Sequence, residues 1–302
     1  MLQSFRNEID TAIRDTNSDD FDTANPSATV PIHQFPRSIQ TLIRSLTQFQ
    51  NFSPKSVKSH IEQANISSED VMPWSDFSHP VTDSYGRKLV FHGGYFEIMV
   101  MSWVPGDYSA IHDHGCTQWG AVQCFGVADH YLYDYRQGLL KTSHPAHYQP
   151  GMIHAVDNGL IHQMGNPGDA SFLSLHVYGC VTHREMITGN ARIFDLLEGT
   201  IQYGDGGAFF CAPEDGIKRR RSGVRGDTET TLRHHQLMGD RIRRILATHD
   251  SPTLTLKLEQ ITQEIARLNA SLSPTEMPLT SHECNRETVI SRCLGKSQTL
   301  NS

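Results

Sequence analysis

Two histidines that stand two residues apart are the clearest candidates for chemistry in this sequence. They end the run Pro105-Gly-Asp-Tyr-Ser-Ala-Ile-His112-Asp-His114, which opens on a turn-forming Pro-Gly-Asp. Side chains i and i+2 of a β-strand point to the same side, so His112 and His114 are predicted to direct two imidazoles into one interior. Imidazole is a common ligand of transition metals, and two such ligands make half of a metal site. Asp113 is expected to point outward and not to bind the metal.

A third ligand must come from a later strand, and two histidines compete for that place. His154 follows the turn Pro150-Gly151 and stands four residues before Asn158. His162 stands four residues before Asn166, in the same spacing. Periodicity does not separate the two candidates, so both stay open on this evidence.

The elements that must position these histidines are predicted to be short strands. Between residues 85 and 178, β-prone runs alternate with turns such as Gly93-Gly94, Pro150-Gly151 and Pro167-Gly168-Asp169. Many short strands with regularly placed turns are typical of an antiparallel barrel or sandwich. We therefore expect a mainly β fold whose barrel carries the histidines.

Helices are predicted on both sides of the barrel in the sequence. Before it, apolar residues recur at helical spacing on one face, at Ile39, Leu42, Ile43 and Leu46, and a second short helix is expected after Ser53-Pro54. After it, a second apolar stripe consists of Leu254, Leu258, Ile261, Ile265 and Leu268. We expect this stripe to pack within the monomer; the alternative is a homo-oligomer formed through the C-terminal helices.

The predicted domain organisation follows these changes of pattern. It comprises a polar lead-in (1–35), an N-terminal helical segment (36–73), the barrel (74–212), a charged, glycine-containing linker (213–230) and a helical C-terminal extension (231–302). The role of that extension is open at this point.

Composition excludes several classes of protein. The formal net charge of -7 argues against a general nucleic-acid binder. The basic run 218–221 is interpreted as a solvated loop. No apolar run approaches the ~20 residues of a membrane span, so no membrane partner is expected. The N-terminus lacks the apolar core of a signal peptide, which favours a cytoplasmic location.

Several separated motifs together resemble a known family. Tyr85-Gly-Arg87, a hydrophobic strand ending in Trp103, the His112-Asp-His114 motif, and the later run IHQMGNPGDASFLSLHVYG follow one another in order. In this order and nearly in this spacing they resemble type I cysteine dioxygenases of the cupin superfamily. The resemblance covers residues 74–179, around a third of the chain. It implies a cupin-type antiparallel β-barrel, or jelly roll.

The resemblance also implies the site and its chemistry. Because His162 stands 12 residues before Ser174, as the family's spacing requires, it is selected over His154 as the third ligand of an Fe²⁺ ion. Ser174, His176 and Tyr178 would form the family's hydrogen-bonded relay beside the iron. The implied reaction oxidises L-cysteine to cysteine sulfinic acid with O₂, a step of cysteine catabolism that needs no organic cofactor.

Arg87 is the residue that the resemblance assigns to the substrate. A guanidinium presents a planar fork that suits a carboxylate, and the family carries its carboxylate-binding arginine at this position. Tyr85 is expected to line the same pocket. Related dioxygenases for 3-mercaptopropionate look different here, so Arg87 favours cysteine as the substrate.

One departure from the family's pattern concerns the relay tyrosine. Mammalian members link it through a thioether to a cysteine that stands shortly after the His-x-His motif. Here the corresponding positions hold Trp119 and Gly120, and neither can form that bond. We therefore expect a bacterial-type site without a crosslink, although Cys116 and Cys124 lie close enough in sequence to leave the question open.

Two alternatives to a cysteine dioxygenase remain. The first is a dioxygenase for another small thiol, such as 3-mercaptopropionate. The second is a non-catalytic cupin that serves as a binding or regulatory module.

Overall fold

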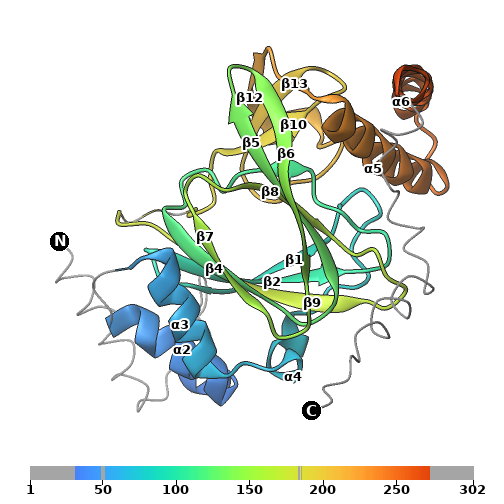
Figure 1. Cartoon of the computed structure of the whole chain (residues 1–302). Helices are drawn as coiled ribbons and strands as arrows, with labels where there is room; N and C mark the ends of the chain where they lie inside the picture. The colour runs from blue at the N-terminus through green and yellow to red at the C-terminus, as the bar shows by residue number, and fades with distance from the viewer. Residues whose placement is uncertain (1–30, 49–51, 183, 185, 273–302) are drawn as a thin grey trace, which may run out of the picture.

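The computed structural model describes residues 31–48, 52–182, 184 and 186–272 (Figure 1). Most of the predicted polar lead-in and residues 273–302 of the predicted extension lie outside these ranges. The described N-terminal elements are η1 (Ile32–Gln34), α2 (Arg37–Gln48), α3 (Pro54–Ala64), α4 (Ser68–Val71) and η2 (Met72–Trp74). The described C-terminal elements are η3 (Glu214–Gly216), α5 (Thr228–Leu246) and α6 (Pro252–Ser271).

Two β-sheets face each other between these helical ends. The five-stranded sheet has the order β1 (Gly86–His92), β2 (Phe96–Trp103), β9 (Phe172–Gly179), β4 (Trp119–Cys124) and β7 (Ile153–Asp157). The eight-stranded sheet has the order β12 (Ile217–Ser222), β11 (Thr200–Gly204), β10 (Ala191–Asp195), β3 (Ile111–His112), β8 (Ile161–Gly165), β5 (Ala128–Arg136), β6 (Leu139–Tyr148) and β13 (Arg225–Gly226). The fold is the mainly β, cupin-type jelly roll that the sequence predicts.

The N-terminal helices cover the outer face of the five-stranded sheet (Figure 1). The four apolar residues predicted to form one face of α2 are all buried. Ser53 caps α3, where its hydroxyl accepts a hydrogen bond from the Ser56 amide, and Pro54 takes the first helical position. The leucine and valine side chains of β9 pack against these helices in one core, so β9 is buried on both faces.

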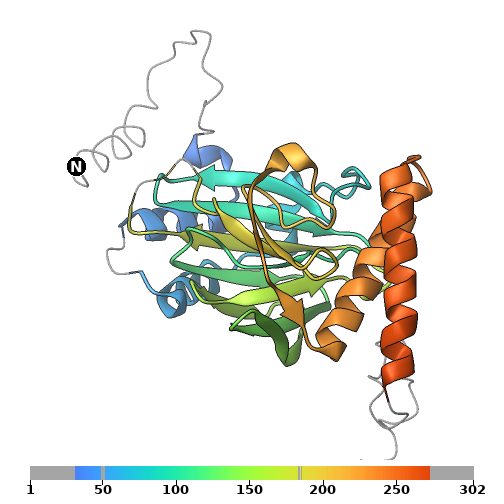
Figure 2. The ribbon, with the colours of Figure 1, turned by 90° about the horizontal axis from the view of Figure 1, so that it is seen from above.

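The C-terminal helices lie on the other side of the molecule, beside the eight-stranded sheet (Figures 1 and 2). Ile261 and Leu268 of the α6 stripe are buried, and Leu254, Leu258 and Ile265 pack against the same core as α5. The predicted packing within the monomer is therefore confirmed. Oligomer formation through these helices stays a prediction. No helix among the described residues is both long and apolar enough to cross a membrane.

Residues 213–230, expected to be a linker with a solvated basic loop, are built into the barrel. β12 pairs antiparallel with β11, and β13 pairs in parallel with β6. The basic run of β12 is exposed on the edge of the sheet. Charged side chains on an edge strand discourage pairing with other chains, and they also hide the alternation by which a strand is detected.

Candidate active site

His112 ends the short strand β3 at the interior face of the eight-stranded sheet. Its Nδ1 donates a hydrogen bond to the Ala110 carbonyl over 2.8 Å. This bond fixes the ring and leaves Nε2 as the nitrogen free to bind a ligand. His112 also pairs directly with His162 across β3 and β8, which brings two imidazoles from distant parts of the sequence together.

His162 lies at the centre of a chain of imidazoles. Its Nε2 is 3.1 Å from Nε2 of His114, and its Nδ1 is 2.8 Å from Nε2 of His130. One nitrogen from each of His112, His114 and His162 lies within 4.8 Å of the others. Among the residues that the structure describes, these three form the group that could hold a metal ion.

The electrostatics of the group suit a metal cation. Burial lowers the pKa of His112, and burial together with the neighbouring imidazoles holds the pKa of His114 and His162 well below the usual range. The three rings are therefore neutral near pH 7 and offer lone pairs, which is the form that binds a transition metal.

His154 and Asp113 were both expected not to bind the metal, and the structure places them in different surroundings. His154 lies on β7 of the opposite sheet, where its ring packs edge-on against Tyr148 with centroids 4.2 Å apart. It is outside the histidine group. Asp113 is buried rather than outward-facing, which corrects that expectation. The side chain and amide of Arg192 bind its carboxylate, and this partly buried ion pair explains the inward position.

A hydrogen-bonded relay faces the histidines from β9 of the five-stranded sheet. Trp103 Nε1 donates to Ser174 Oγ over 2.8 Å, Ser174 Oγ lies 2.7 Å from His176 Nε2, and His176 Nδ1 lies 2.8 Å from the Tyr178 hydroxyl. All four side chains are buried. The ring of Tyr178 also contacts His114, with centroids 4.8 Å apart.

The donor capacity of Trp103 and the tautomer of His176 together set the direction of the relay. An indole can only donate, so Ser174 accepts from Trp103, and the direction of the other two hydrogen bonds depends on the tautomer of His176. In the tautomer with its single proton on Nδ1, neutral His176 accepts from Ser174 and donates to the Tyr178 oxygen, which leaves the phenolic O–H free to point into the cavity. Burial lowers the pKa of His176 to about 3, so the ring stays neutral in this role. Burial raises the pKa of Tyr178 well above its usual range, so its proton stays in place.

The cavity lies between the two sheets and is lined by residues of both. It has a free volume of about 30 Å³, against the ~10–15 Å³ that one water molecule requires. Its lining includes Tyr85, Arg87, Met99, Met101, His112, Asp113, His114, Tyr178, Thr188, Ala191, Gly206 and Ala208. The predicted substrate residues thus share one small cavity with His112 and His114, and a small ligand fits it best.

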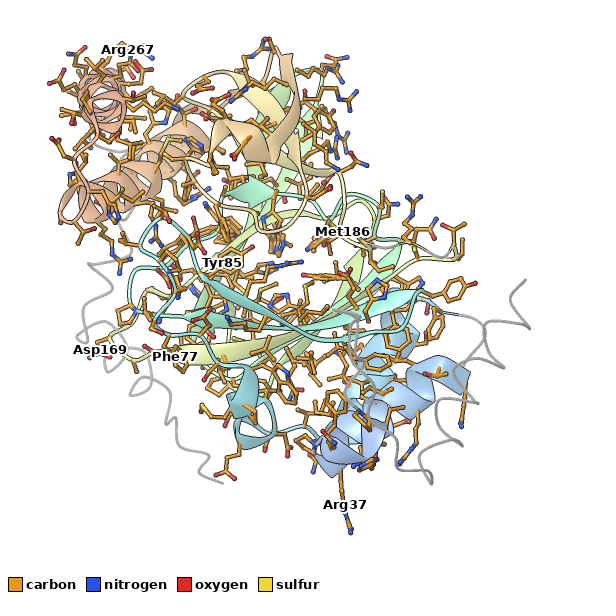
Figure 3. All side chains as sticks on the ribbon, turned by 180° about the vertical axis from the view of Figure 1, so that it is seen from behind. Arg37, Phe77, Tyr85, Asp169, Met186 and Arg267 are labelled. Atoms are coloured by element: carbon orange, nitrogen blue, oxygen red, sulfur yellow. The ribbon has the colours of Figure 1, made fainter. Side chains whose placement is uncertain are left out.

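Arg87 and Tyr85 reach this cavity from one end of β1. The guanidinium of Arg87 makes a long hydrogen bond of 3.4 Å to Thr188, so most of its donors are available to a ligand. The Tyr85 hydroxyl accepts a hydrogen bond from the Ala208 amide over 2.9 Å. Its ring stacks on Trp103, and it lies toward the middle of the molecule, between the sheets (Figure 3).

The sequence analysis did not identify several residues in or near the cavity, among them His130, Thr188 and Ala208. His130 stands diagonally across the β5–β8 pairing from His162. Its position in a β-prone, histidine-rich run was visible in the sequence, but its partner depends on the strand register. Thr188 and Ala208 lie in connecting segments after the motifs that the sequence analysis used, and no local pattern marks them.

Gly120 stands directly opposite Tyr178 in the pairing of β4 and β9. A Cβ atom at this position would lie 2.9 Å from Cδ1 of the tyrosine ring. Cys124 is paired with Ser174, and its thiol is directed to the Gly126 carbonyl. The residue nearest to the tyrosine on β4 therefore carries no side chain.

Solved cupin-like structures align with part of this chain. A double-stranded β-helix protein from Klebsiella pneumoniae subsp. pneumoniae MGH 78578 is 22% identical, with 38% of this chain and 89% of that chain covered at a TM-score of 0.30. A cupin 2 conserved barrel protein from Salinispora arenicola CNS-205 is 14% identical, with 34% and 81% covered at a TM-score of 0.26. A cupin-superfamily sugar phosphate isomerase from Silicibacter pomeroyi DSS-3 is 19% identical, with 50% and 84% covered at a TM-score of 0.31.

The sequence also matches a family model, and this match covers β1 to β9 and the helices before them. The model is that of cysteine dioxygenase type I, and it matches residues 29–180, half of the chain. The matched range contains the three clustered histidines, the β9 relay and Arg87. The chain therefore belongs to the cysteine dioxygenase type I family.

Proposed function

We propose that this protein is an iron-dependent dioxygenase that oxidises L-cysteine to cysteine sulfinic acid. Family membership implies a thiol dioxygenase of the cupin superfamily, which acts on a small molecule and O₂. The observation that supports the fuller proposal is one cavity that is lined by Arg87, Tyr178 and two imidazoles of the three-histidine group, His112 and His114. The balanced reaction is R–SH + O₂ → R–SO₂H, in which both oxygen atoms enter the product.

His112, His114 and His162 would hold the metal, and their geometry fits one ion. Three imidazoles without a carboxylate leave a divalent ion its full charge, which favours anionic ligands such as a thiolate. When bound, Fe²⁺ would supply the redox chemistry by which O₂ reacts with a thiolate. His130 would accept the Nδ1 proton of His162 and so keep its Nε2 lone pair for the ion.

Arg87 would bind the substrate carboxylate. It presents donors to a cavity in which no acid among the described lining residues is free to pair with it, because Asp113 is bound to Arg192. A bidentate guanidinium–carboxylate contact fixes orientation as well as position. Tyr85, held by the Ala208 amide, would form the adjacent wall.

Tyr178 would donate its free O–H to substrate or dioxygen. The relay from Trp103 through Ser174 and His176 orders this hydroxyl before any ligand arrives. Such preorganised donors stabilise developing negative charge without reorganisation. We propose that Tyr178 acts without a thioether, as in bacterial-type members, because Gly120 faces it. Intact-mass and peptide analysis would detect the unmodified tyrosine; a Tyr178 crosslinked to Cys116 or Cys124 would contradict this part.

Two other functions are distinguished by experiment. A dioxygenase for 3-mercaptopropionate would share the metal site and differ in its dependence on Arg87. A non-catalytic cupin module would bind a metal, or none, without oxidising thiols. Our proposal includes no nucleic-acid or membrane partner.

The test compares steady-state rates of O₂ uptake on L-cysteine and 3-mercaptopropionate, for the iron-loaded wild type and Arg87→Ala. We expect the wild type to prefer L-cysteine and the variant to lose that preference. A wild type that prefers 3-mercaptopropionate, with little effect of the substitution, would show that the substrate is misassigned. Iron-loaded wild type that takes up no O₂ with either thiol would support the binding module.

A further inference from the structure

Helix α5 lies beyond the range that the family model matches, yet one of its side chains reaches toward the cavity. Arg241 is buried, with 4% of its surface exposed. Its guanidinium donates to the Val81 carbonyl over 3.0 Å, to the Ser84 carbonyl over 3.1 Å and to the Asp107 carboxylate over 2.7 Å. One planar group thus joins two separate segments of the chain.

Both segments lead directly into residues of the proposed site. Ser84 immediately precedes Tyr85, and Arg87 follows two residues later. Asp107 belongs to the Pro-Gly-Asp turn that precedes His112. Arg241 therefore fixes the start of the substrate-binding segment relative to the start of the metal-binding segment.

Asp107, whose carboxylate binds Arg241, is itself held in place by several contacts. Its side chain is fully buried, accepts a hydrogen bond from the Val104 amide over 2.9 Å and lies 3.2 Å from His79. Its carbonyl accepts the Asn166 amide over 2.7 Å, which ties the turn to the end of β8. Displacement of this turn would therefore shift β8, the strand that carries His162.

A second connection runs through the segment after β11, which also lies beyond the family range. The Ala208 amide donates to the Tyr85 hydroxyl, and the Ala208 carbonyl accepts the Ala110 amide over 2.8 Å. The Ala110 carbonyl in turn accepts His112 Nδ1. A continuous chain of hydrogen bonds therefore joins the proposed substrate wall to a proposed metal ligand.

We infer that the C-terminal extension completes the active site, with Arg241 as a positioning residue that sets Tyr85 and Arg87 against the histidines. This inference rests on the proposed function for what the site binds. A buried ion pair is weak evidence for stability alone, because a well-packed apolar side chain often serves as well. A positioning role better explains the three hydrogen bonds that Arg241 donates to two separate segments.

Arg244 offers a matched control on the same helix. It contacts the same turn, through Asp107 over 3.4 Å and the Pro105 carbonyl over 2.8 Å, and the hydrogen bonds recorded for it do not include residues 81–84. Arg241→Met and Arg244→Met therefore each remove one positive charge beside Asp107. They differ in the contact to residues 81–84 and in burial, since the side chain of Arg241 is 3% exposed and that of Arg244 is 37% exposed. Arg241→Lys keeps the charge and removes the planar fork, and it provides a folded variant should Arg241→Met not fold.

The first readout is anaerobic calorimetric binding of L-cysteine to the iron-loaded full chain, with iron content and melting temperature measured alongside. We expect Arg241→Met to weaken binding about 10-fold or more at unchanged iron content, Arg241→Lys to fall in between, and Arg244→Met to change it by less than about 2-fold. Cysteamine, which lacks a carboxylate, should bind equally to all variants. Equal L-cysteine affinity in wild type and both folded Arg241 variants would overturn the inference.

Hydrogen exchange of the metal-loaded protein provides the second readout, which needs no substrate. Arg241→Met or Arg241→Lys should speed exchange of the amides at 84–89, and Arg244→Met should not. Unchanged exchange there in the Arg241 variants would overturn the positioning role. If exchange changes but wild type binds no L-cysteine, positioning stands and the proposed function is wrong.

Discussion

The two walls of the cavity come from different sheets and offer different chemistry. The eight-stranded sheet contributes imidazoles, from β3, from the turn after it and from β8, whose burial keeps them neutral. The five-stranded sheet contributes β9 and β1, which place the Tyr178 hydroxyl and the Arg87 guanidinium at the cavity. One wall has lone pairs without charge, and the other has protons and a cation.

This difference indicates a division of labour. Neutral lone pairs bind a metal cation, whereas directed donors bind the anionic groups of a substrate. A substitution on the first wall should therefore change metal content, and a substitution on the second should change turnover or substrate binding at constant metal content. Each prediction below tests that separation.

The wall formed by the eight-stranded sheet is called the metal wall below, and the wall formed by the five-stranded sheet is called the donor wall. The largest effect is expected on the metal wall. His162→Ala removes a proposed ligand, so metal binding should be lost by a larger factor than the roughly 10–100-fold that follows loss of an outer partner. His154→Ala is the control and should retain most of the metal, since its ring packs against Tyr148. Metal analysis after dialysis distinguishes the two. Retention by the first variant and loss by the second would mean that the third ligand is misassigned.

Tyr178→Phe tests the donor wall. The substitution keeps the ring against His114 and deletes the O–H that the relay directs into the cavity. We expect the turnover number to fall by about 10²- to 10³-fold, as for loss of one preorganised donor, at unchanged metal content. A parallel loss of metal would break the division between the walls.

His130→Leu tests whether the metal wall depends on its outer partner. The leucine cannot accept the Nδ1 proton of His162, so metal affinity should fall by about 10- to 100-fold. Competition with a chelator measures it. His130→Gln can accept the same proton through its amide oxygen and should restore part of the metal affinity. Equal metal affinities in wild type, His130→Leu and His130→Gln would exclude this role of His130.

Arg87→Ala should act on substrate binding with the metal retained. Loss of charge-assisted hydrogen bonds to the carboxylate should raise KM for L-cysteine about 10- to 100-fold. Arg87→Lys should recover part of this, since it keeps the charge without the fork. Steady-state kinetics at measured iron content checks the prediction, and an unchanged KM would remove Arg87 from the substrate site.

The smallest effect is expected from pH. The pKa of His112, His114 and His162 is lowered, so protons do not compete with the metal until the pH falls well below the ordinary value near 6.5. Metal affinity should change by less than about 2-fold between pH 8 and pH 6.5, and binding should release no protons from these ligands. Calorimetry in two buffers of different ionisation enthalpy measures this. A steep fall in affinity below pH 7.5 would show that the rings are protonated in the metal-free protein.

Much of the fold could be predicted because its signals are local. The apolar face of α2 and the alternation of β9 depend on spacing along one segment. β12 could not be predicted, because an exposed edge strand needs no apolar side and its basic run resembles a loop. The inward position of Asp113 was also missed, because it depends on a distant partner, Arg192.

The site divides in the same way. His112 and His114 were recognisable from spacing, and His162 was preferred over His154 only through the family resemblance. His130 and Arg241 were not predicted, because their roles arise from strand register and from a contact across 134 positions of sequence. Local pattern predicted the inward direction of His112 and His114, and it did not predict which distant residues contact them or Asp113.

The most direct test of the central claim measures O₂ consumption and sulfur products together, for iron-loaded wild type and His162→Ala with L-cysteine. We predict that the wild type consumes O₂ and L-cysteine in equal amounts and forms cysteine sulfinic acid, with both oxygens derived from ¹⁸O₂. His162→Ala should form none. Wild type that holds iron yet consumes no O₂ in the presence of the thiol would contradict the account.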